Sequence, residues 1–200
     1  MQQAKAPNEG DLKRLERLED YIRATPRHGL VIRPNSSQLE AWVDASYGVH
    51  PEGQSHTGIL LTLGGATVYA TSNKQKLVTT SSSQAELAAL SSAVDKVIWA
   101  RDWLEEKGYA QGAVTVHQDN QSTMRLAEKG YGASSRTKHW NIRLFRVKET
   151  IDQGLVSIKY MRSEDMLADP LTKPVPRDTL KKWREAIGVI ELHEAPTGST

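Results

Sequence analysis

The chain has 200 residues, of which 38% are hydrophobic and 25% are charged, and its net charge is +2. This length suits one compact domain with flanking segments. No apolar stretch approaches the ~20 residues of a membrane helix, and the start MQQAKAPNEG lacks the apolar core of a signal peptide. The absence of cysteine excludes disulfides and thiolate metal sites and fits an intracellular protein.

The first predicted elements are a helix and three strands. Residues 11–24 carry leucine and isoleucine at helical spacing, and Pro26 and Gly29 end this helix. Three runs with strand character follow between residues 39 and 76: LEAWVDASYG, HTGILLTLGG and ATVYATSNKQ. Turns containing Pro or Gly separate them, so we expect an antiparallel meander.

The second half of the chain alternates helices and strands. A long helix is predicted from Ser83 to Lys107, with Gly108 ending it. The elements expected after it are a strand at 113–118, a helix at 120–129, a Gly/Ser loop, a helix at 136–152, the strand LVSIKYM and a helical region broken by prolines. This order predicts an α/β (mixed) fold, a mixed sheet with helices packed on it.

Two acidic residues occupy unusual positions in these elements. Asp44 interrupts the middle of a strand, where Asp is disfavoured, although alternation could place it on the wet face of the sheet. Glu86 shares a helical face with Leu90 and Val97, which directs its carboxylate toward the sheet. A capping box with a serine at 82 or 83 is the competing interpretation of Glu86.

Further acids lie where ligands are commonly bound. Asp119 follows a strand directly, at the carboxyl end where open α/β sheets place ligands, although capping of the next helix would also explain an acid there. The segment SEDMLADPLTK contains Glu164, Asp165 and Asp169. Acids converging in a partly desolvated cleft would repel one another, and divalent cations relieve that repulsion. An all-oxygen ligand set favours Mg²⁺ or Mn²⁺ over zinc.

Four motifs then match a known family in order: VDAS with Gly58 after the turn, SSSQAELAAL, QDNQS and LADPLTK. They resemble the type 1 ribonuclease H fold. Together with SSRTKHWNIRLFRVKE and the ending ADPLTKP, they look like the ribonuclease H domain of copia-type LTR retrotransposon polyproteins, where it follows the reverse transcriptase. The resemblance covers residues 39–175. It implies a five-stranded mixed sheet with three antiparallel N-terminal strands and helices on both faces.

The same resemblance implies an activity and a domain organisation. It assigns the acidic tetrad of the family to Asp44, Glu86, Asp119 and Asp169, which would hold two Mg²⁺ ions, with Mn²⁺ as a substitute, and hydrolyse the RNA strand of an RNA–DNA hybrid. The expected segments are a flexible tail at 1–10, a connection helix and linker from the polymerase at 11–34, the ribonuclease H domain at 35–188 and a flexible tail at 189–200.

Two features depart from the family pattern. Many cellular relatives carry a mobile His before the last catalytic helix, and IKYMRSEDMLAD contains none. Turnover could be slower, or His139 could partly replace that residue, although a lone His beside a basic helix is more often a surface or substrate contact. Asp165 lies close enough in sequence to replace Asp169 as the fourth metal ligand.

Substrate contacts are expected from a basic helix and from polar neighbours of the acids. Residues 136–148 contain five cations and no acid, and a second basic stretch spans 173–184. Such runs are often solvated faces, but an RNA–DNA hybrid must be held by its phosphates, and polar side chains can read its 2′-hydroxyls. The predicted contacts are Ser46, Ser83, Gln84, Asn120, Gln121, Arg136, Lys138, His139, Arg143 and Arg146.

Other functions stay open at this point. A non-catalytic module of the same fold, acting as a nucleic-acid clamp or structural spacer, is the alternative from a different class. Exonucleases of the superfamily require an acid at the position of Ser46, and integrases require Glu at that of Gly154, so both lack a defining residue. The expected partners are the hybrid and a polymerase domain in the same polyprotein, with no membrane, in the cytoplasm or in retrotransposon particles.

Overall fold

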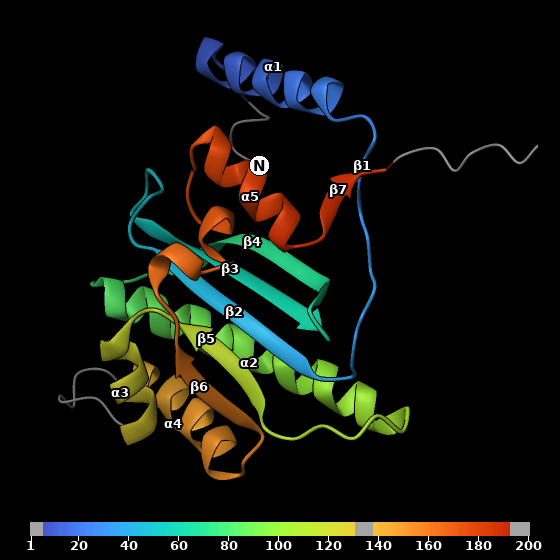
Figure 1. Cartoon of the computed structure of the whole chain (residues 1–200). Helices are drawn as coiled ribbons and strands as arrows, with labels where there is room; N and C mark the ends of the chain where they lie inside the picture. Colours follow the sequence, from blue (N-terminus) through green and yellow to red (C-terminus); the bar gives the residue numbers. More distant parts are fainter. Residues whose placement is uncertain (1–5, 131–137, 193–200) are drawn as a thin grey trace, which may run out of the picture. The chain divides into compact units, whose positions relative to one another are not determined.

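The computed structural model describes residues 6–130 and 138–192 (Figure 1). The chain divides into two compact units, the first formed by residues 1–31 with 189–200 and the second by Ile32–Gly188. The predicted domain, residues 35–188, falls within the second unit. None of the described helices is long and apolar enough to cross a bilayer.

The first unit contains a helix and a small sheet. Helix α1 (Glu9–Ala24) begins with a capping box between Asn8 and Asp11 and has no buried residue. Strands β1 (His28–Leu30) and β7 (Val189–Glu191) pair antiparallel. The prediction of a flexible tail from residue 189 is therefore wrong for residues 189–191. A three-residue strand has no periodicity to recognise, and its partner lies near the other end of the chain.

The second unit is built on a five-stranded sheet with the order β4-β3-β2-β5-β6. Strands β2, β3 and β4 form the antiparallel meander. Strand β5 pairs parallel to β2, and β6 pairs parallel to β5. The strand bounds are β2 (Leu39–Ser46), β3 (Gln54–Leu63), β4 (Ala66–Val78), β5 (Val114–Gln118) and β6 (Val156–Tyr160). This arrangement confirms the predicted mixed sheet with three antiparallel N-terminal strands.

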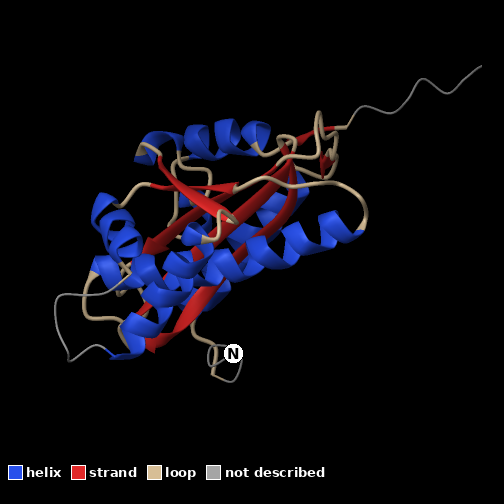
Figure 2. Ribbon diagram, turned by 90° about the horizontal axis from the view of Figure 1, so that it is seen from below, coloured by secondary structure: helices blue, strands red, loops and turns tan. Residues whose placement is uncertain are grey.

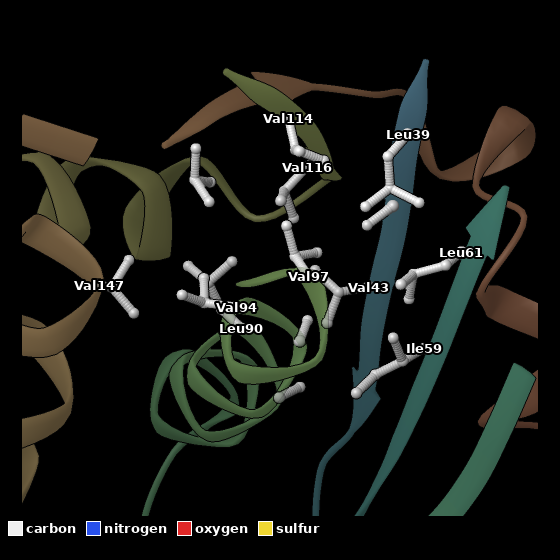
Figure 3. Packing of buried hydrophobic residues seen from close by; sticks show 14 of the residues in the cluster. Leu39, Val43, Ile59, Leu61, Leu90, Val94, Val97, Val114, Val116 and Val147 are labelled. Carbon is white, nitrogen blue, oxygen red and sulfur yellow. The ribbon is translucent and has the colours of Figure 1, made fainter. Parts of the chain in front are cut away.

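Helices cover one face of this sheet. Helix α2 (Ser82–Glu106) lies across it, as seen from below in Figure 2. Its residues Leu90, Val94 and Val97 pack against Val43 and Ile59 of the strands (Figure 3). Burial of this apolar surface is the main stabilising contribution to the unit. Helices α3 (Gln121–Lys129) and α4 (Lys138–Asp152) contact α2 and each other.

The opposite face carries the short helices that precede the last long one. These are the 3₁₀ turns η2 (Ser163–Asp165) and η3 (Asp169–Leu171), followed by α5 (Arg177–Ala186). Trp183 of α5 donates its indole N–H to the carbonyl of Leu167 over 2.7 Å. This bond holds α5 against the segment between the two turns. Since η3 contacts β2 and β3, helical segments lie on both faces of the sheet, as predicted.

Gly58 allows η3 to approach the sheet closely. It pairs with Asp44 across β2 and β3, on the face opposite α2. A Cβ atom at this position would lie 2.8 Å from the Ala168 carbonyl oxygen, from a Leu171 carbon and from a Thr172 carbon. Real side chains do not tolerate such contacts, so the absence of a side chain at residue 58 sets the height of η3 above the strand.

Replacing Gly58 with alanine is expected to push η3 away from β3. Overpacking of this kind costs about 1–3 kcal/mol. We expect a lower unfolding temperature, measured by thermal unfolding, because the close packing of η3 on β3 is lost. Alanine at Gly112, where an added Cβ meets no atom within 4 Å, is the matched control. Equal stability of the two variants would contradict this account.

Candidate metal centre

Asp44 and Glu86 are brought to the same place by β2 and α2. Asp44 lies on the face of β2 opposite the core and is only 5% exposed. The alternative that alternation leaves Asp44 on a wet face is therefore wrong, because η3 covers that face here. Glu86 is also 5% exposed. The N-cap of α2 is Ser81, so Glu86 lies beyond the capping positions and the capping-box interpretation is wrong.

Asp119 follows β5, and the next residue takes over the capping role. Asn120 is the N-cap of α3, and its side-chain oxygen accepts a bond of 3.0 Å from the Thr123 N–H. The Asp119 carboxylate is thus free of the helix end. It accepts a 2.6 Å hydrogen bond from the Ser163 hydroxyl.

These three acids form one cluster. One carboxylate oxygen from each of Asp44, Glu86 and Asp119 lies within 4.8 Å of the other two. The cluster forms because β2 and β5 are parallel neighbours, so their carboxyl ends meet at one edge, and α2 begins close to that edge. Three residues that are far apart in the sequence therefore converge on one position.

Burial of the cluster perturbs its protonation. Desolvation, followed by the fields of Asp44 and Asp119, raises the pKa of Glu86 to about 9. Desolvation also raises the pKa of Asp44 to about 6, although the hydrogen bond from Thr172 opposes the rise. Without a cation, Glu86 therefore retains its proton at neutral pH, and the cluster carries fewer than three full charges.

A buried glutamine connects two of these acids. Gln118 is fully buried, and its side-chain oxygen accepts from the backbone N–H groups of Asp119 and Asn120 over 2.8 and 3.0 Å. Its amide nitrogen donates to Glu86 over 3.4 Å. One side chain thus fixes the turn after β5 and the orientation of the Glu86 carboxylate.

Of the two candidates for a fourth acid, Asp169 lies nearer to the cluster. Its charge contributes to the raised pKa of Asp44, and its carboxylate is 2.7 Å from the ammonium of Lys173. Asp165 belongs to the separate turn η2, where its exposed carboxylate lies 3.4 Å from Arg162. The two acids therefore do not share a helical face.

The segment after Asp169 adds two polar contacts. The Thr172 hydroxyl donates to Asp44. Burial alone would lower the pKa of Lys173, but its bond to Asp169 and the nearby charges of Asp44 and Asp119 raise it overall. Lys173 therefore places a positive charge beside the acids, a role that its position in a basic stretch of the sequence does not indicate.

The cluster has the chemistry of a divalent-cation site. All its donor atoms are carboxylate oxygens, which suit Mg²⁺ or Mn²⁺. Burial is the largest cause of the raised pKa values of Asp44 and Glu86, and the neighbouring acids raise them further, so a cation would stabilise the ionised carboxylates. The residues present therefore fit a divalent metal ion.

The predicted substrate contacts lie on several elements of the second unit. Ser46 ends β2, Ser83 and Gln84 lie in the first turn of α2, and Asn120 and Gln121 begin α3. The backbone of Lys138 and His139 begins α4, whereas Arg136 lies outside the described residues. Arg143 and Arg146 lie further along α4. Arg143 also lines a cleft of about 260 Å³ together with Lys76 and Lys96.

Sequence reasoning missed four residues of this region: Gln118, Ser163, Thr172 and Lys173. Gln118 offered a signal, since a polar residue at the end of an otherwise buried strand needs partners. Thr172 and Lys173 belong to the motif LADPLTK, but nothing local indicates that they reach Asp44 and Asp169. Ser163 gave no sequence signal.

Comparison with known proteins supports the predicted resemblance. No protein-family model matches the sequence. The chain is 29% identical over 170 residues to the retrovirus-related Pol polyprotein from transposon TNT 1-94 of Nicotiana tabacum, covering 84% of this chain. It is 29% identical over 189 residues to that from transposon RE1 of Arabidopsis thaliana, covering 93% of this chain. The aligned region spans only 13% of each relative, so the chain resembles one segment of a polyprotein.

Solved structures give the fold. LC11-RNase H1, isolated from compost by a metagenomic approach, superposes with a TM-score of 0.52 at 19% identity, covering 73% of this chain and 97% of that one. The same enzyme in complex with an RNA/DNA hybrid gives a TM-score of 0.51 at 18% identity, covering 68% of this chain and 94% of that one. The chain has the ribonuclease H fold, as predicted.

Proposed function

We propose that this chain, which has the ribonuclease H fold and resembles a segment of transposon Pol polyproteins, is a metal-dependent endonuclease that hydrolyses the RNA strand of RNA–DNA hybrids. The observation that carries the proposal is the convergence of Asp44, Glu86 and Asp119 within 4.8 Å. LC11-RNase H1 has been crystallised with an RNA/DNA hybrid, which supports the choice of substrate.

In this proposal the acids coordinate the metal, and neighbouring polar side chains orient the acids. Asp44, Glu86 and Asp119 would bind divalent ions. Asp169 would be the fourth ligand once its ion pair with Lys173 is broken. Bound Mg²⁺ ions supply an activated water and stabilise charge on the leaving oxygen of a phosphodiester. Gln118 orients Glu86, Ser163 orients Asp119, and Thr172 orients Asp44. These neutral donors reduce the number of conformations that the carboxylates can adopt before the metal binds.

The hybrid would be held by α4 and by the polar residues around the centre. Trp140, Leu144 and Val147 are buried against the rest of the unit. Arg146 is exposed, whereas Arg143 is half-buried, with its guanidinium 5.6 Å from the centre of the Trp140 ring and 3.5 Å from the Ala88 carbonyl. Arg143 and Arg146 would contact phosphates, and Ser46 and Gln121 would reach sugar hydroxyls. Arg136, Lys138 and His139 are kept as hybrid contacts on the basis of the sequence alone.

The chain would act as part of a longer polyprotein. In this proposal α1 belongs to the connection from a polymerase domain, in the cytoplasm or in a retrotransposon particle. The apolar side chains of α1 support this assignment, since Leu12 is 56% and Ile22 is 58% exposed. An apolar stripe of this kind commonly marks a surface for another domain.

The test is cleavage of an end-labelled RNA–DNA hybrid in Mg²⁺, in Mn²⁺ and with a chelator. Double-stranded RNA and double-stranded DNA of the same sequence are the controls. We expect cleavage of the hybrid alone and only with metal. A folded protein that binds the hybrid without cutting it would overturn the proposal and favour the non-catalytic clamp.

Replacement of Arg143 with glutamine is expected to weaken hybrid binding without abolishing cleavage. Each phosphate contact contributes about 0.9 to the slope of log affinity against log salt, so the slope should fall by about one. The measurement is hybrid binding over a range of salt concentrations, with Arg143→Lys as the charge-preserving control. If Arg143→Gln leaves the slope at its wild-type value, Arg143 does not contact a phosphate.

A further inference from the structure

A line of hydrogen bonds crosses the outer strands and ends on the segment that carries Asp169. The Ser72 hydroxyl of β4 donates to the carbonyl of Leu171 in η3 over 2.6 Å. The Ser72 oxygen also lies 2.8 Å from Nε2 of His56 on β3. Nδ1 of His56 lies 2.9 Å from Nε2 of His50, in the turn between β2 and β3. We call these residues, His50, His56 and Ser72, the histidine–serine chain.

The acceptor at the end of this chain fixes the direction of every bond. A carbonyl oxygen can only accept, so the single hydroxyl hydrogen of Ser72 is committed to Leu171. The Ser72 oxygen therefore accepts from the N–H at Nε2 of His56. Nδ1 of a neutral His56 then accepts from the N–H at Nε2 of His50. The histidine–serine chain selects the Nε2–H tautomer of both histidines, and each hydrogen bond orients the donor of the next one.

The strand register places the histidine–serine chain beside the metal centre. Asp44, Gly58 and Ser72 lie opposite one another across β2, β3 and β4. The segment of η3 lies over this row. Thr172 donates to Asp44 at one end, Gly58 leaves room in the middle, and Ser72 donates to Leu171 at the other end. Two hydroxyl groups thus attach the segment to the sheet at two separate points.

Two attachments are significant for so short an element. A 3₁₀ turn of three residues has poor hydrogen-bond geometry and little stability of its own. One attachment would leave η3 able to rotate about it, which would move Asp169 relative to Asp44. The second attachment, from Ser72, removes that freedom.

We infer that His56 and Ser72 are positioning residues for the metal centre, which hold η3 so that Asp169 stays close to Asp44. This inference rests on the metal-binding part of the proposed function and assigns a role to two residues outside the acidic cluster. Ser72 and His56 do not touch the metal ligands themselves; they act through the backbone of Leu171.

The test is the affinity for Mn²⁺, measured by calorimetry on the intact chain without nucleic acid. Ser72→Ala removes one hydrogen bond and is expected to weaken Mn²⁺ binding about three- to tenfold. Since Ser72 is exposed, water can replace the hydroxyl at Leu171, so the unfolding temperature should change little. Ser157→Ala is the matched control, because the Ser157 hydroxyl also has a cross-strand partner, the Thr115 hydroxyl at 3.5 Å, but lies on β6 at the opposite edge of the sheet.

The histidine provides a second, independent arm. His56→Gln retains an N–H near the position of Nε2 and should bind Mn²⁺ within about twofold of the wild type, whereas His56→Ala should resemble Ser72→Ala. Wild-type affinity in both alanine variants would overturn the inference, as would a lower unfolding temperature with unchanged Mn²⁺ affinity. Hybrid cleavage is measured separately, so a wild-type protein that binds Mn²⁺ without cutting would overturn the proposed function and leave the role of the histidine–serine chain standing.

Discussion

Replacement of Asp119 with asparagine is expected to abolish metal-dependent cleavage of the hybrid, with a rate loss on the order of 10³-fold or more. The amide has the same size as the carboxylate but lacks its charge. Asp119 is one of three acids within 4.8 Å, so its loss removes a ligand on which the others depend. Asn120 provides the helix cap independently, and the fold should therefore survive.

The measurement is single-turnover cleavage in Mg²⁺, with hybrid binding and thermal unfolding on the same samples. Asp102→Asn is the matched control, since that exposed carboxylate lies on α2 beside Arg101 and far along the helix from Glu86. The pair Asp169→Asn and Asp165→Asn separates the two candidates for the fourth ligand. The structure favours a large loss for Asp169 and a small one for Asp165. Cleavage at the wild-type rate by Asp119→Asn would refute the site.

The acids at the centre of the site were predictable because each one conflicts with its local surroundings. Asp44 lies in a strand, and Glu86 heads an apolar helical stripe. An acid is costly at either position unless something compensates it. Asp119 was less distinctive from its local sequence, since capping of the next helix would also explain an acid there. The structure resolves the ambiguity, because Asn120 makes the cap and leaves Asp119 to the cluster.

The supporting contacts could not be predicted, because they depend on how distant segments meet. Thr172 and Asp44 are 128 positions apart, and their contact follows from the close approach of η3 to Gly58. The choice between Asp165 and Asp169 as the fourth acid could not be made from sequence for the same reason, because it also depends on how the turns pack. The proline after Asp169 signalled a break in helical geometry, but only the packing of the two turns directs one acid inward and leaves the other with Arg162.

Replacement of Glu86 with glutamine is expected to stabilise the metal-free protein at pH 8 while it abolishes cleavage. The pKa of Glu86 is raised to about 9 in the folded state, well above its ordinary value of 4.5. Between these two values the folded state keeps a proton that the unfolded state releases, so the stability of the metal-free wild type falls as the pH rises from 4.5 to 9. Glutamine is neutral throughout this range and removes that dependence.

The expected gain at pH 8 is about 2–5 kcal/mol, or roughly 5–15 °C in unfolding temperature for a chain of this size. The measurement is thermal unfolding in chelator from pH 5 to pH 9, repeated with Mg²⁺. Since a bound cation takes the place of the proton retained by Glu86, Mg²⁺ should stabilise the wild type at pH 8 and have much less effect on Glu86→Gln. Glu128→Gln on the exposed side of α3 is the control and should change stability by less than about 0.5 kcal/mol. If Glu86→Gln unfolds at or below the wild-type temperature in chelator at pH 8, the cluster does not carry the electrostatic cost that makes it a metal site.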